Sequence, residues 1–193
     1  MKKIVAILAL AITTSAFADK IIIEARDAQG ATTSGPHTSG TKSSDQNQYK
    51  LTYAKDVNAN WQVDYSVISV QTQSTELTAG SRIEAGALYR DKIAGLPVYL
   101  RGGYGLKTTT AANFAYYSVE PGVMIPLGNF TGRVGYRFRD AVDPNNTNAD
   151  ETRTWRYGLG YNVTKDSSVW LRYDKMRGDT AQNVTFVAFE HKF

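Results

Sequence analysis

Hydrophobic and polar residues alternate along most of this chain with a period of two, which is the pattern of β-strands that have one apolar and one polar face. The clearest stretch is 130–140, where Phe, Val and Tyr at even positions alternate with Thr and Arg at odd positions. Similar stretches predict ten strands, at 20–26, 48–55, 61–72, 78–90, 97–107, 116–127, 130–140, 152–163, 168–177 and 183–193. Counts of eight or twelve strands remain open, because strand boundaries are the weakest part of such predictions.

The links between the predicted strands alternate between short and longer. Gly128-Asn129 is a two-residue hairpin turn, whereas residues 27–47 are rich in Gly, Ser and Thr and predict a long flexible loop. Aromatic residues also gather near both ends of the strands, on the apolar parity, as they do at the two surfaces of a bilayer. Strands of about 8 to 13 residues can cross a bilayer when tilted. Together these features predict an all-β fold, a transmembrane up-and-down antiparallel β-barrel with short turns on the periplasmic side.

The first residues have the pattern of an export signal. A basic start at Lys2 and Lys3 precedes an apolar run, and a small-x-small exit ends at Ala18. We therefore expect residues 1–18 to be a signal peptide and residues 19–193 to form one outer-membrane barrel domain.

The amino-acid composition limits the kinds of functional site that the chain can form. The chain has no cysteine, which excludes disulfides and thiolate metal sites, and we expect no cofactor or metal site. Its mean hydropathy of −0.36 suits a barrel, since only alternate side chains face lipid. Of its two histidines, His37 falls in the predicted first loop and His191 near the end of the last strand, neither beside a carboxylate. We therefore expect no enzymatic activity.

The polar parity of the strands, which a barrel turns toward its lumen, is strongly basic. It carries six carboxylates, at Glu24, Asp64, Glu84, Glu120, Asp174 and Glu190. It carries twelve cations, at Arg26, Lys50, Arg82, Arg90, Arg101, Lys107, Arg133, Arg137, Arg139, Arg156, Arg172 and Lys192. This excess predicts either an anion-attracting passage or an interior filled by ion pairs, because small barrels are barely wide enough to remain open.

Two resemblances add to these patterns. The final strand, with Phe193 last and Phe189, Val187 and Thr185 at alternate positions before it, resembles the closing strand of bacterial outer-membrane barrels. That resemblance implies recognition by the barrel-assembly machinery. The stretches 117–123 and 133–139 look like strands of the oligogalacturonate-specific porin family, which implies an arginine-lined pore for acidic oligosaccharides. Members of that family have about two more strands than the ten predicted here.

The sequence therefore predicts an integral, monomeric outer-membrane porin that passes small anionic solutes, with acidic oligosaccharides as one such class. The alternative is a closed structural or adhesive barrel without transport. Expected partners are outer-membrane lipid, lipopolysaccharide and small anions, but not nucleic acid, because the basic residues are interleaved along strands. The candidate anion-binding residues are Arg82, Arg101, Arg133, Arg137, Arg139, Arg156 and Arg172.

Overall fold

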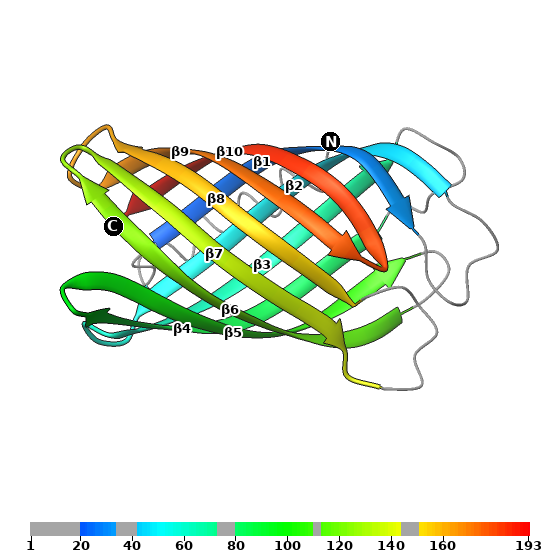
Figure 1. Cartoon of the computed structure of the whole chain (residues 1–193), viewed down its shortest axis with the longest axis horizontal. Coiled ribbons are helices and arrows are strands. Elements are labelled where there is room, and N and C mark those ends of the chain that lie inside the picture. The colour runs from blue at the N-terminus through cyan, green and yellow to red at the C-terminus, as the bar shows by residue number, and fades with distance from the viewer. Residues whose placement is uncertain (1–19, 34–41, 73–79, 110–112, 144–150) are drawn as a thin grey trace.

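A computed structural model of the chain describes residues 20–33, 42–72, 80–109, 113–143 and 151–193. The described residues form ten strands: β1 (Lys20–Thr33), β2 (Lys42–Asp56), β3 (Trp61–Thr72), β4 (Gly80–Ile93), β5 (Leu96–Thr109), β6 (Asn113–Leu127), β7 (Phe130–Ala141), β8 (Thr152–Asn162), β9 (Ser167–Gly178) and β10 (Thr180–Lys192). Each strand pairs antiparallel with its neighbours in sequence, and β1 pairs with β10, so the sheet closes into a barrel (Figure 1). The predicted fold class is confirmed, with ten strands.

The predicted long loop at residues 27–47 is wrong for most of its length. β1 continues to Thr33 and β2 begins at Lys42, and these two ends pair with each other, with Thr33 opposite Lys42. These stretches consist mostly of small and polar residues and therefore lack the regular alternation that reveals a strand, but backbone pairing does not require an apolar face. Residues 34–41, with His37, and the predicted signal peptide lie outside the described residues.

Tight hairpins join strands at the end of the barrel that carries the short turns. Gly128 has φ +66°, which confirms the predicted Gly128-Asn129 turn. The predicted turn at residues 91–96 is shorter than expected, because β4 extends to Ile93 and β5 begins at Leu96. Ala94 and Gly95 form the connection with φ of +51° and +83°, and positive φ at both central residues is the property of a type I′ turn.

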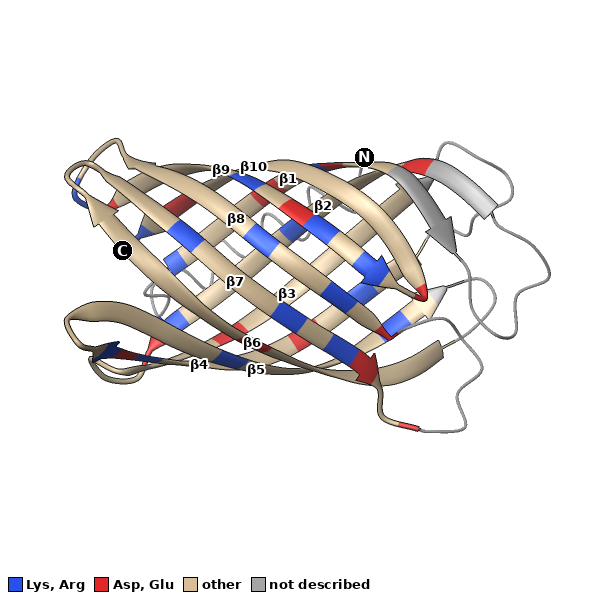
Figure 2. Ribbon diagram, viewed as in Figure 1, with Lys and Arg blue, Asp and Glu red and all other residues tan. Residues whose placement is uncertain are grey.

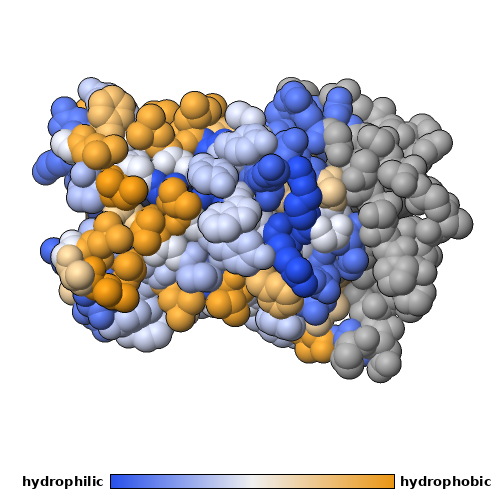
Figure 3. Space-filling view, viewed as in Figure 1, coloured by the Kyte–Doolittle hydropathy of each residue, from blue (hydrophilic) through white to orange (hydrophobic). Residues whose placement is uncertain are grey.

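Many large hydrophobic side chains are exposed on the outer surface of the barrel, and on the face in Figure 3 they gather over the part that leads to the short turns. Side chains of the apolar parity, such as Leu159 and Leu171, are about half exposed, and aromatic pairs border them at both ends. Near the short turns the pairs are Trp61–Tyr89 and Phe130–Tyr161, and toward the other end they are Tyr117–Phe138 and Tyr136–Trp155. A closed hydrogen-bonding ring with an apolar exterior is what a hydrocarbon environment demands of a sheet. The described residues include no helix of the length and apolarity needed to cross a membrane.

The interior differs between the two halves of the barrel. Toward the longer links, Ala28, Val184 and Phe186 form a buried apolar cluster, and Thr152, Thr154 and Tyr116 are also almost fully buried. Toward the short turns the inward positions are mainly charged, and Figure 2 shows acidic and basic positions along most strands of the barrel. The candidate site therefore lies in the half of the lumen next to the short turns.

Candidate functional site: a cationic lumen

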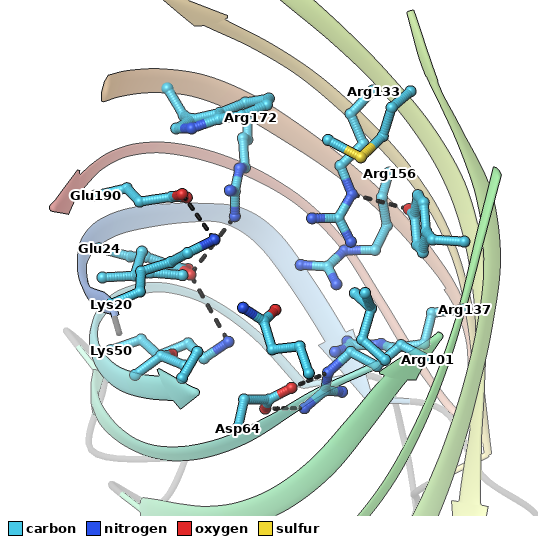
Figure 4. A pocket seen from close by; sticks show the side chains of 18 of the residues that line it. Lys20, Glu24, Lys50, Asp64, Arg101, Arg133, Arg137, Arg156, Arg172 and Glu190 are labelled. Carbon is cyan, nitrogen blue, oxygen red and sulfur yellow. Dashed lines mark hydrogen bonds and ion pairs between the residues drawn. The ribbon is translucent and has the colours of Figure 1, made fainter. Parts of the chain in front are cut away.

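A cavity of about 140 Å³ occupies this half of the lumen (Figure 4). All ten strands contribute residues to its walls, and Lys20, Arg90 and Glu190 lie toward the short turns. Four carboxylates line it, from Glu24, Asp64, Glu84 and Glu190, and eight cations line it, from Lys20, Lys50, Arg90, Arg101, Arg133, Arg137, Arg156 and Arg172. Positive charge therefore exceeds negative charge two to one around the cavity.

Five of the seven arginines predicted as the site are brought together here: Arg101, Arg133, Arg137, Arg156 and Arg172. The other two do not line the cavity. Arg82 lies opposite Lys107 on the strand pair β4–β5, and Arg139 places its guanidinium carbon 5.3 Å from the centre of the Tyr116 ring. Both face inward but lie closer to the longer links than the cavity does.

Glu120 on β6 is the centre of the first charge network. Its carboxylate accepts hydrogen bonds from Arg133 Nη2 at 2.8 Å, from Arg156 Nη1 at 2.5 Å and from the Tyr99 hydroxyl at 3.0 Å. Arg156 also donates from Nε to Asp174 at 3.2 Å, and Arg133 Nε donates to the Tyr99 hydroxyl at 2.8 Å. The side chain of Glu120 is only 1% exposed, so two arginines on two other strands neutralise a fully buried carboxylate.

Arg101 on β5 is the centre of the second network. It donates to Asp64 in a two-pronged arrangement, with Nε 2.9 Å from Oδ2 and Nη2 2.6 Å from Oδ1, which Figure 4 shows as two dashed lines. The same Nη2 lies 2.6 Å from Glu84 Oε1. Two carboxylates therefore hold one guanidinium, whose planar fork suits this geometry.

Glu24 on β1 forms a third network that is cationic overall. It pairs with Arg26, and its Oε1 lies 3.7 Å from Lys50 Nζ and 3.6 Å from Arg172 Nη1. One carboxylate thus serves three cations. At the mouth of the cavity the ion pair Lys20–Glu190, at 2.8 Å, adds no net charge.

Arg137 on β7 differs from these arginines. Among the described residues, no hydrogen bond or ion pair joins its side chain, although it is only 9% exposed and lines the cavity. Its Nε is buried without a hydrogen-bond partner. Arg137 therefore lines a cavity with an excess of cations, and its guanidinium has donors that no described side chain uses.

Three aromatic residues lie in the lumen that the sequence analysis did not place there. Tyr99 lies 4.4 Å below the guanidinium of Arg133, Trp170 lies 4.9 Å below that of Arg172, and Phe186 lies 4.7 Å below that of Arg26. These stacks keep the guanidinium planes fixed. The alternation of the strands could have placed two of them in the lumen, since Tyr99 and Trp170 are each two residues from an inward arginine.

The residues that could support catalysis or metal binding lie away from the cavity. His191 has its Nδ1 2.8 Å from the Ser167 hydroxyl, and its ring lies between Phe189 and Phe193 on the outward parity. The described residues contain no group of three or more His, Cys, Asp or Glu side chains placed to hold a metal ion.

Comparisons with known proteins give the fold. No family model and no curated protein sequence matches the chain. Among solved structures, the translocator domain of autotransporter NalP from Neisseria meningitidis aligns with a TM-score of 0.59 and 8% identity, over all of this chain and 95% of that one. An outer-membrane channel from Pseudomonas putida F1 aligns with a TM-score of 0.52 and 8% identity, over 91% of this chain and 96% of that one.

The KdgM porin is also similar, with a TM-score of 0.47 and 12% identity over 89% of this chain and 99% of that one, but this likeness is too weak to carry an argument. Identities this low show a shared fold and nothing about solutes. The expected fold is nevertheless confirmed: the chain has the architecture of an integral outer-membrane β-barrel.

Proposed function

We propose that this barrel is an outer-membrane channel whose lumen binds and passes small anionic solutes. The observation that carries the proposal is Arg137, a buried guanidinium on the cavity wall that no described carboxylate contacts directly. A buried charge is costly unless it is paired, so this position favours a mobile anion as its partner.

The surrounding charges support the same conclusion. The carboxylates nearest to Arg137 are already engaged, because Glu84 contacts Arg101 and Asp174 contacts Arg156. An entering carboxylate, phosphate or inorganic anion therefore meets little competition from fixed acids. A guanidinium offers such groups a fork of donors in one plane.

The size of the cavity narrows the solute class. Its volume of about 140 Å³ is below the roughly 300–1,000 Å³ of pockets that enclose drug-sized ligands. An inorganic anion or a small carboxylate fits this space. Acidic oligosaccharides would use the same chemistry, but the packed half of the lumen around Val184 and Phe186 would have to widen for them. If that packing does not move, the protein is instead a closed structural or adhesive barrel.

The test is single-channel recording of the refolded protein in a planar bilayer under a salt gradient. We expect discrete steps with a reversal potential that favours anions, and Arg137→Gln should move that potential toward zero. Lys165→Gln is the matched control, because it removes the same charge from an exposed turn and should leave the potential unchanged. Arg137 is the sharper target than Arg133 or Arg156, since those two also hold Glu120 in place.

A folded barrel that shows heat-modifiable migration on a gel but conducts no ions would overturn the proposal in favour of the closed barrel. If Arg137→Gln conducts with unchanged selectivity, Arg137 does not set the preference for anions, and only the general excess of positive charge in the lumen could do so.

A further inference from the structure

Three cations lie side by side on the outward face of the barrel, at the ends of β8 and β9 that are opposite the short turns. At this end a long link precedes β8, whereas Asp179 alone joins β9 to β10. They are Arg153, Lys175 and Arg177, all exposed, and we call them the β8–β9 cationic patch. In the register of the two strands Arg153 is directly opposite Arg177, and Trp155 is opposite Lys175. Figure 3 shows a band of strongly hydrophilic side chains beside the apolar surface on this view of the barrel.

The patch adjoins an aromatic ledge formed by Trp155, Tyr157 and Tyr173. Trp155 stacks on Tyr157 with centroids 6.5 Å apart, and Tyr157 stacks on Tyr173 at 6.4 Å, all on the outward parity. Aromatic rings of this kind mark the interface between hydrocarbon and headgroups. Lys175 is level with Trp155, and Arg153 and Arg177 lie one step farther along the same strands, so all three cations are at headgroup level. Because longer links mark the external side of such barrels, this is the outer leaflet.

The protein supplies little counter-charge for the patch. Arg153 and Arg177 lie directly opposite each other, and two like charges in this position repel and destabilise a sheet. Arg153 has one carboxylate, Glu151, at 2.8 Å, but the Arg153 side chain is 60% exposed, so solvent weakens this pair. Arg177 donates to the backbone oxygen of Met176 at 2.6 Å, and among the described residues no ion pair joins Lys175.

The cations are also restricted to this part of the circumference. Where side chains are described, the outward positions of the other strands toward the longer links are uncharged or acidic, as at Asp27, Gln71 and Thr108. A general attraction to an anionic surface would not require all three cations on two adjacent strands. Their grouping indicates a ligand that carries more than one negative group within a short span.

We propose that the β8–β9 cationic patch binds the phosphate groups of a lipopolysaccharide molecule in the outer leaflet. Adjacent strands are about 4.8 Å apart, and alternate residues of one strand are about 7 Å apart. Three cations at this spacing suit a headgroup with several phosphates, and arginine binds phosphate oxygens through two donors at once. The aromatic ledge would contact the start of the acyl chains. This proposal does not depend on whether the lumen conducts.

The experiment is native mass spectrometry of the refolded full chain in detergent with purified lipopolysaccharide. The test variant is Arg153→Gln/Lys175→Gln/Arg177→Gln. The matched control is Lys55→Gln/Lys92→Gln/Lys165→Gln, which removes three exposed cations at the opposite end of the barrel. Wild type and control should retain lipopolysaccharide equally, and the test variant should retain it at least tenfold less. Chemical dephosphorylation of the lipopolysaccharide should reproduce that loss with the wild type.

Heat-modifiable migration on a gel checks that each variant is folded. If the triple variant does not fold, Lys175→Gln alone replaces it, and we then expect a smaller loss of bound lipopolysaccharide. Equal retention by the test and control variants would overturn the proposal. So would equal retention of dephosphorylated lipopolysaccharide, which would mean binding through acyl chains alone. Equal retention of phosphatidylglycerol would indicate a general anionic surface and would also overturn it.

Discussion

Arg156 on β8 contacts Glu120 on β6 at 2.5 Å, across the intervening strand β7. This ion pair joins two strands that share no backbone hydrogen bonds, and Glu120 holds Arg133 of β7 at the same time. Side chains in the lumen therefore connect non-adjacent strands, in addition to the ladder of the barrel wall.

Glu120→Gln should destabilise the barrel strongly. Removing one partner of a buried ion pair costs about 3–5 kcal/mol, because the remaining charge stays buried without compensation. Here two arginines would lose a carboxylate that is 1% exposed. Urea unfolding in lipid vesicles, followed by tryptophan fluorescence, measures the change. Glu151→Gln is the control, since its exposed pair with Arg153 should contribute only about 0–1 kcal/mol. Equal losses for the two variants would contradict the role assigned to Glu120.

Gly160→Ala should displace Trp170 from the lumen wall. A Cβ at Gly160 would lie 2.6 to 2.8 Å from atoms of the Trp170 ring, which is closer than such atoms can approach. Overpacking of this kind costs about 1–3 kcal/mol. The near-ultraviolet circular dichroism of the folded barrel should change as well. Gly102→Ala is the control, because a Cβ there meets no atom within 4 Å, and its spectrum and stability should match the wild type.

Ala94→Asn should stabilise the β4–β5 hairpin. Ala94 has φ +51°, a left-handed conformation that costs an alanine roughly 1–2 kcal/mol. Asparagine tolerates this region, and Asn-Gly is the preferred pair for a turn with positive φ at both positions. We expect the free energy of unfolding to rise by about 0.5–1 kcal/mol. Gly95→Ala, at φ +83°, should have the opposite sign, and two shifts in the same direction would show that backbone strain is not the cause.

Leu171→Arg should be costly because Leu171 faces lipid near the middle of β9, 57% exposed and opposite Leu159. An arginine on the lipid face costs about 2–4 kcal/mol at the bilayer midplane and about 0–1 kcal/mol near the interfaces. Val163→Arg, just past the end of β8, is the interfacial comparison. Folding into lipid vesicles at varied urea concentration would give both values. If the two substitutions cost the same, the assigned depth of the apolar belt is wrong.

The strands that cross the apolar belt could be predicted from the sequence, because lipid outside and charge inside force alternation. The stretch 130–140 is an example, and its structure as β7 follows the predicted parity. The ends of β1 and β2 were missed, because beyond the belt their residues are mostly small or polar and no regular alternation remains. The sequence also could not show that Arg156 contacts a carboxylate whereas Arg137 does not. Both are inward arginines in the sequence, and only the stagger of β6 to β9 decides which of them meets a carboxylate.

Nine of the ten strand pairings join neighbours in sequence, and the tenth is the seam between β1 and β10, where Lys20 lies opposite Lys192. Until that seam forms, both strands expose a full row of unpaired backbone groups, which hydrocarbon does not tolerate. The half-made sheet can persist in water or beside another strand, but not inside the bilayer. Membrane entry and ring closure are therefore coupled events, and the seam is the place where a protein that assists insertion would have to act.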